Sequence, residues 1–147
     1  MYTFIQKFHS GWAYLALLLL VLAVVNSVSG MVRNKEFSVN DRKIALFALV
    51  FAHVQLLIGL VLYFVSPLGY SNIGTSGMGE VMKNAALRQT VIEHPITNII
   101  AIGLITIGWS KHKKVTLSAQ KFKSIAIFYG IGLILLLSMI PWKNWLS

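Results

Sequence analysis

Four long apolar runs, separated by short polar segments, dominate the pattern of the chain. A helix rises about 1.5 Å per residue, so about 20 apolar residues cross the roughly 30 Å hydrocarbon core of a bilayer. Each run is close to that length. The pattern therefore predicts four transmembrane helices, at about residues 10–32, 43–65, 88–110 and 123–141.

Capping residues and prolines mark the expected helix boundaries. Ser38 and Asp41 stand before the second run, where such side chains bind the free amides of a first turn. Pro95 lies one turn inside the third run, and a helix that began there would reach only about 24 Å before Lys111. We therefore expect Pro95 to lie within the third helix and to kink it, and Pro141 to end the fourth.

The segment between the second and third runs is different in composition. Residues 68–79 combine four glycines with small polar residues and show no apolar periodicity, which predicts turns rather than regular structure. Residues 80–90 predict a short amphipathic helix on the outer surface.

The composition leaves too little polar chain for a separate soluble domain, because 56% of the 147 residues are hydrophobic and only 12% are charged. We predict one domain, residues 1–147, that is an all-α integral membrane protein. Short connections between the first two and the last two helices predict an antiparallel four-helix bundle. The first run is longer than the apolar part of a signal peptide, so it is expected to stay attached.

The net charge of +9 is unevenly placed along the chain. Nine of the 13 Lys and Arg residues lie in the two short connections, which the positive-inside rule assigns to the cytoplasm. Both termini are then outside, and the partner of the basic surface is the lipid bilayer rather than nucleic acid. The nine residues are Arg33, Lys35, Arg42, Lys43, Lys111, Lys113, Lys114, Lys121 and Lys123.

Few ionisable side chains fall within the predicted spans. His53 lies near the middle of the second span, Glu93 and His94 near the outer end of the third, and His9 at the outer end of the first. Ionisable groups at membrane depth are costly, which makes these residues candidates for a functional site. His112 stands among lysines and is expected to be solvated.

Histidines that face one another across a helical bundle, in a chain without cysteine, favour haem b ligation. His53 is about 15 Å above the basic border of its helix and His94 about 25 Å above its own, so His53 with His94 and His9 with His94 are both possible ligand pairs. Arg88 is a candidate partner for haem propionates. Glu93 is a candidate acceptor that orients an imidazole ligand from outside the coordination sphere.

Several short segments are spread almost from end to end of the chain. They are His9-Ser10, Ala52-His53-Val54-Gln55-Leu56-Leu57-Ile58-Gly59-Leu60, Met82-Lys83-Asn84, Leu87-Arg88, Glu93-His94 and Pro141-Trp142. Together they resemble a family of small four-helix bacterial membrane proteins described as cytochrome b-like. The resemblance implies haem b, a place in the bacterial inner membrane, and electron transfer with a quinone pool or with other subunits of a membrane complex.

The leading functional hypothesis is a membrane-embedded, haem b-binding electron-transfer protein or a subunit of a respiratory complex. No nucleotide loop or nucleophile motif is found, so a redox carrier or subunit is favoured over a stand-alone enzyme. One alternative is a cofactor-free structural or accessory subunit of an envelope complex, with its histidines hydrogen-bonded. Another is a metal or proton site built from His9, His53, Glu93 and His94.

Overall fold

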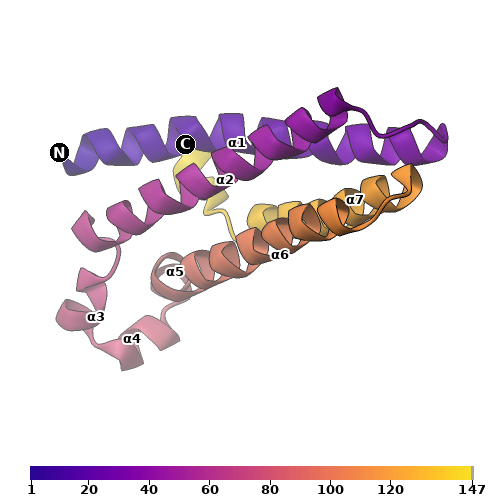
Figure 1. Cartoon of the computed structure of the whole chain (residues 1–147). Coiled ribbons are helices and arrows are strands. Elements are labelled where there is room, and N and C mark those ends of the chain that lie inside the picture. Colours follow the sequence, from indigo (N-terminus) through magenta and orange to yellow (C-terminus); the bar gives the residue numbers. More distant parts are fainter. Residues whose placement is uncertain (147) are drawn as a thin grey trace.

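The protein folds almost entirely into helices. The computed structural model describes residues 1–146, apart from the side chains of residues 144 and 146, and within these residues no strand occurs. The elements are α1 (Tyr2–Val32), α2 (Val39–Val65), α3 (Ser71–Ser76), α4 (Met78–Lys83), α5 (Ala85–Arg88), the π-helix η1 (Gln89–Glu93), α6 (His94–Lys114), α7 (Ser118–Ser138) and α8 (Trp142–Leu146) (Figure 1).

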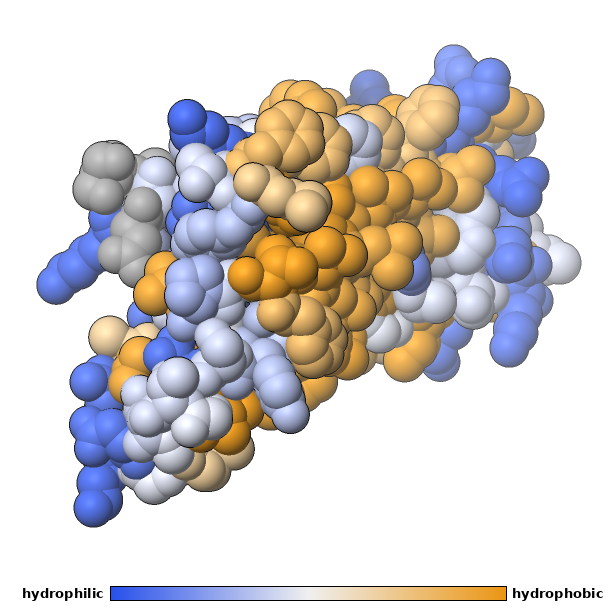
Figure 2. Space-filling model, turned by 90° about the vertical axis from the view of Figure 1, so that its left-hand side faces the viewer, coloured by the Kyte–Doolittle hydropathy of each residue, from blue (hydrophilic) through white to orange (hydrophobic). Residues whose placement is uncertain are grey.

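Four helical segments are long and apolar enough to cross a membrane: α1, α2, the continuous segment Ala85–Lys114, and α7. The prediction of four such helices is confirmed. In Figure 2, apolar residues form a band across the middle of the visible face, and polar residues lie at both ends. This distribution matches a bilayer, which solvates apolar side chains in its core and polar ones at its surfaces.

The observed helices differ from the predicted ones mainly at their ends. α1 begins at Tyr2 rather than near residue 10, and α7 covers Ser118–Ser138 rather than 123–141. A helix continues into polar sequence as long as nothing breaks it, so the apolar run marks only the part that fits the hydrocarbon. The fourth helix therefore starts earlier than its apolar run.

The four long segments pack as a closed ring in which α1 contacts α2 and α7, and α6 contacts α7 and α2. Contacts between α1 and α2 pair early residues of one with late residues of the other. Trp12 Nε1 donates to the Phe51 carbonyl at 3.0 Å, and Asn26 Nδ2 donates to Asp41 Oδ1 at 2.9 Å. Figure 1 shows the two turns, between α1 and α2 and between α6 and α7, at the same end of the bundle, which we call the basic end.

Small residues bring α6 and α7 close together. A Cβ atom built on Gly132 would lie 2.7 Å from Ile105 Cγ1, and one built on Gly108 would lie 2.6 Å from Phe128 Cβ. Close approach between backbones is the usual way in which membrane helices gain packing contacts. Gly103, in contrast, faces open space.

The third span passes through Pro95 without ending, as predicted. Pro95 has no amide hydrogen and its ring crowds the preceding turn of an α-helix. The widened turns of η1 stand directly before it, and such π segments relax the backbone at points of strain in a helix. The helix therefore runs on from Ala85 to Lys114.

The segment before this span was predicted incorrectly in two places. Residues 71–76 form α3 instead of irregular turns, and the helix expected at 80–90 is interrupted at Asn84. Asn84 Oδ1 accepts hydrogen bonds from the amides of Ala86 at 3.0 Å and Leu87 at 3.2 Å. This capping favours a new helix start over continuation of α4.

Candidate functional site

His9 of α1 and His94 of α6 lie opposite each other at the end of the bundle away from the basic end. Their ring centroids are 6.4 Å apart and the rings are perpendicular. Gly59 of α2 leaves room for the His9 ring, because a Cβ atom there would lie only 3.1 Å from His9 Cε1. The arrangement of the two imidazoles therefore depends on three helices, α1, α2 and α6.

A cavity of about 580 Å³ adjoins this pair, and we call it the histidine cavity. This volume lies within the roughly 300–1,000 Å³ typical of sites for cofactors and small ligands. Its walls are mostly aliphatic residues of α1, α2, α6 and α7, with Pro141 and Trp145 from the chain beyond α7. The site thus combines a mostly apolar lining with polar groups that include His9, Gln55, His94 and Asn98.

Hydrogen bonds fix the tautomer of His94. Its Nδ1 donates to the Met139 carbonyl at 3.0 Å, which is free because α7 ends one residue earlier. His94 Nε2 then carries the lone pair, and it accepts from Asn98 Nδ2 at 3.2 Å. A histidine that ligates a metal generally donates its other nitrogen to a carbonyl in this way.

The second histidine of the pair is held by Gln55 of α2. Gln55 Nε2 donates to His9 Nδ1 at 3.1 Å and to the His9 carbonyl at 3.0 Å. In this arrangement the proton of the neutral His9 ring is on Nε2. Gln55 thus joins α2 to α1.

Two buried acceptors of this site have no hydrogen-bond partner among the described residues. They are Gln55 Oε1 and Asn98 Oδ1, and each belongs to an amide whose nitrogen contacts a histidine. An unpaired buried oxygen costs about 1–3 kcal/mol, so such groups need an explanation. Both residues line the histidine cavity, where a bound group with a donor would satisfy them.

His53, the first ligand candidate from the sequence, lies elsewhere. Its Nδ1 donates to the Leu49 carbonyl at 2.8 Å, and its Nε2 lies 3.2 Å from Thr106 Oγ1. Thr106 is 12 residues along α6 from His94, or roughly 18 Å. The structure thus brings His94 together with His9 and keeps His53 at another depth.

Arg88 and Glu93 form an ion pair with each other, with Arg88 Nε 2.6 Å from Glu93 Oε1. Arg88 Nη1 also donates to the Met82 carbonyl at 2.8 Å. Neither residue lines the histidine cavity, so Glu93 holds Arg88 rather than an imidazole. The ion pair spans η1, whose two ends these residues flank.

Within residues 1–146, no three His, Cys, Asp or Glu side chains come together in a way that could hold a metal ion. The four-residue metal or proton site of the sequence hypothesis is therefore not assembled as one cluster. A pair of axial ligands is a different requirement, since a porphyrin supplies the other donors itself.

His112 was predicted to be solvated, and this prediction is wrong. Its side chain is only 1% exposed, and its Nδ1 donates to the Trp109 carbonyl. The rings of Trp109 and Phe37 pack against it at centroid distances of 4.5 and 5.4 Å. The lysines beside it in sequence, Lys111, Lys113 and Lys114, are exposed, whereas these two rings cover the imidazole.

Comparison of the chain with protein-family models, with curated proteins and with solved structures found no match. The resemblance to cytochrome b-like proteins therefore stays a prediction, and the site must be interpreted from its own geometry.

Proposed function

We propose that this protein is a membrane-embedded haem b protein that transfers electrons, and that His9 and His94 would hold the haem iron. The observation that carries the proposal is the facing pair of imidazoles beside a cavity of cofactor size. Haem supplies one-electron redox chemistry, and the protein supplies ligation, a dry environment and orientation toward partners.

The separation of the rings supports this pairing. Metal–nitrogen bonds of about 2 Å, plus roughly 1 Å from each nitrogen to its ring centre, would separate two imidazoles that hold one iron by at most about 6 Å. The observed centroid distance of 6.4 Å is close to that limit. The aliphatic lining of the histidine cavity matches the apolar faces of a porphyrin.

The two histidines differ in whether their present tautomer suits metal binding through Nε2. His94 already has its proton on Nδ1 and its lone pair on Nε2. His9 needs its proton on Nδ1, and a half-turn of the Gln55 amide would bring Oε1 to that position as an acceptor, at the cost of the bond to the His9 carbonyl. This change would give one of the two unpaired acceptors a partner.

The proposal includes an antiparallel bundle in the inner membrane of a bacterium, with the basic end in the cytoplasm and both termini outside. The nine Lys and Arg residues at the basic end support this orientation. Labelling of single-cysteine variants tests it cleanly, because the chain has no cysteine of its own. A cysteine at Lys113 should resist an impermeant thiol reagent in intact cells, and one at Thr75 should react. The reverse result would contradict the orientation.

The histidine cavity would then lie in the outer half of the membrane. Electrons would be exchanged there with a quinol or with another subunit of a membrane complex, which suits a redox carrier or subunit better than a stand-alone enzyme. A quinol is also supported independently, since its hydroxyl groups could donate to Gln55 Oε1 and Asn98 Oδ1. We therefore keep a haem-free quinol-binding subunit as the second candidate.

An absorbance spectrum of protein purified from its native membrane tests the leading proposal. We expect a Soret band that shifts on reduction, as haem b requires. Extraction and quantification of quinone from the same sample tests the second candidate. Protein with quinone but no haem would favour that candidate, and protein with neither would favour a cofactor-free accessory subunit.

A further inference from the structure

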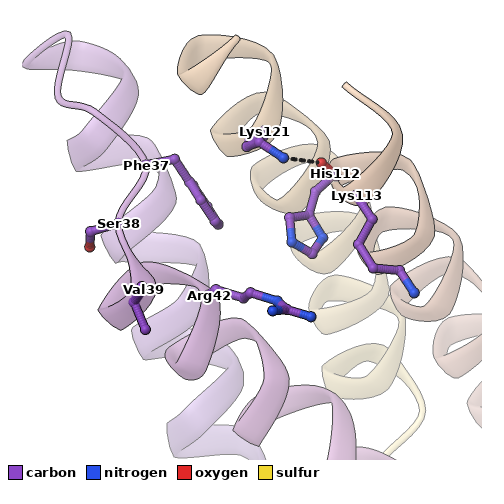
Figure 3. Close-up of a pocket in the computed structure, with 7 residues that line it drawn as sticks. All are labelled: Phe37, Ser38, Val39, Arg42, His112, Lys113 and Lys121. Carbon is purple, nitrogen blue, oxygen red and sulfur yellow. Dashed lines mark hydrogen bonds between the residues drawn. The ribbon is translucent and has the colours of Figure 1, made fainter. Parts of the chain in front are cut away.

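A second cavity lies at the basic end, 420 Å³ in volume, between the turn that joins α1 to α2 and the ends of α6 and α7. We call it the basic pocket. Its lining includes three cationic side chains, those of Arg42, Lys113 and Lys121, and no carboxylate. Figure 3 shows these side chains and the His112 ring around one common space.

Aromatic rings hold two of these cations in place. Arg42 Cζ lies 5.6 Å from the centre of the Trp109 ring, and Lys113 Nζ lies 5.8 Å from it. Contacts of this kind with an aromatic ring stabilise a cation without neutralising its charge. The positive charges of Arg42 and Lys113 are therefore gathered at one site.

The third cation and the histidine complete the pocket. Lys121 Nζ donates to the His112 carbonyl at 2.9 Å, a dashed line in Figure 3, and lies 5.9 Å from the centre of the Phe37 ring. The His112 side chain is almost wholly buried, and its Nδ1 is used by the Trp109 carbonyl. The ring is one wall of the pocket.

The nearby acids do not balance this charge. Both oxygens of Asp41 are occupied, Oδ1 by Asn26 and Lys35 and Oδ2 by Lys35 and Ser38. Glu36 is exposed on the turn and does not line the pocket. Like charges at close range repel one another, and no carboxylate in the lining reduces the repulsion among Arg42, Lys113 and Lys121. An anion in the pocket would reduce it.

We propose that the basic pocket binds a phosphate group, with Arg42, Lys113 and Lys121 as its cationic partners. Guanidinium and ammonium groups are the usual partners of phosphate in proteins. A pocket of this kind between membrane helices at the cytoplasmic surface suits the phosphodiester of an anionic lipid, and a soluble phosphate offers the same chemistry.

The test compares two double variants with equal charge change on the same helices. Arg42→Gln with Lys113→Gln removes two cations of the pocket, whereas Lys43→Gln with Lys114→Gln removes their sequence neighbours, which do not line it. Lys121 is left unchanged because its hydrogen bond to His112 joins α7 to α6. The purified proteins are titrated with phosphatidylglycerol or phosphatidylcholine and bound lipid is counted by native mass spectrometry.

We expect the wild type to bind one phosphatidylglycerol in clear preference to phosphatidylcholine. The pocket variant should lose about 25-fold in affinity, since each basic residue near a lipid surface contributes about a fivefold factor. The neighbour variant should keep most of its affinity. Equal losses in the two variants, or no preference for phosphatidylglycerol, would overturn the proposal.

Inorganic phosphate then distinguishes the two sources of the ligand. If millimolar phosphate leaves the bound phosphatidylglycerol in place, the site is one for lipid. If phosphate displaces the lipid from the wild type at low concentration and the pocket variant does not bind phosphate, the site is one for a soluble phosphate. Haem content is measured in every sample as a separate readout of the histidine cavity. The lipid-binding result can then be judged whether or not haem is present.

Discussion

Buried polar side chains at the two ends of this bundle differ in whether their hydrogen bonds are satisfied. At the basic end, Asp41 is only 2% exposed in its side chain and accepts hydrogen bonds from three other residues. At the other end, Gln55 and Asn98 each keep one buried oxygen without a partner. One end contains a satisfied network that fixes a turn, and the other contains polar groups that are left open. The open acceptors beside the histidine cavity require a ligand that donates hydrogen bonds, whereas the Asp41 network requires none.

The largest effect expected is loss of haem from His94→Ala. An axial ligand disappears and alanine supplies no replacement, so haem affinity should fall by more than the roughly 10- to 100-fold that loss of an outer partner of a metal site costs. The protein should still insert, because the change makes its helix less polar. Haem per protein in purified samples measures the effect.

His53→Ala is the matched control, since His53 is bonded to Leu49 and lies near Thr106 rather than in the histidine cavity. We expect it to keep its haem, and His9→Ala to lose it. Full haem content in His94→Ala, or its loss in His53→Ala, would mean that the wrong pair of histidines has been assigned.

A smaller effect is expected from Gly132→Leu, which tests the packing that connects the two ends. The Ala101 carbonyl and the Ile105 side chain leave no room for a side chain there, so we expect a loss of about 3 kcal/mol in stability. Gly103→Leu adds the same atoms on an open face and should leave stability unchanged. Unfolding in mixed micelles by denaturing detergent compares them, and equal losses would show that this close contact does not matter.

Most of the fold could be predicted from the sequence because its main signal is local. Twenty apolar residues in a row leave few alternatives to a membrane helix, and all four were identified. The segment 68–90 was predicted less well, since the break at Asn84 depends on one side chain that competes with the backbone. Composition alone cannot show whether Asn84 continues one helix or begins a new one.

The candidate site could be predicted only in part. The sequence identified His9, His53 and His94 but left their pairing open, because a helix offset of about 10 Å lies within the range that tilt allows. The pairing depends on contacts between helices: Gly59 makes room for His9, and Met139 and Gln55 orient the rings. His112 was misjudged because its burial depends on the rings of Phe37 and Trp109, which its charged neighbours in sequence do not indicate.

The next prediction concerns Asp41→Asn at the basic end. The substitution removes the charge that Lys35 pairs with at 2.8 Å and weakens the capping of α2 by Ser38 and residue 41. Because Lys35 is 40% exposed, part of its charge is solvated, and we expect a loss of about 1–2 kcal/mol in stability. Glu36→Gln, on the exposed turn beside it, is the control and should change little. Thermal unfolding followed by circular dichroism gives the ranking.

The smallest effect is expected from Glu93→Gln, which breaks the corresponding ion pair at the other end. Arg88 and Glu93 have side chains 35% and 33% exposed, so water already screens both charges, and such pairs contribute less than about 1 kcal/mol. Glutamine keeps an oxygen that can accept from Arg88 Nε, and Arg88 retains its bond to the Met82 carbonyl. Stability should therefore fall less than in Asp41→Asn, and haem content should stay at the wild-type value, because the Glu93 side chain pairs with Arg88 and does not line the histidine cavity. A loss of stability equal to that of Asp41→Asn would remove the contrast between the two ends, and a loss of haem would show that the Arg88–Glu93 pair supports the histidine cavity.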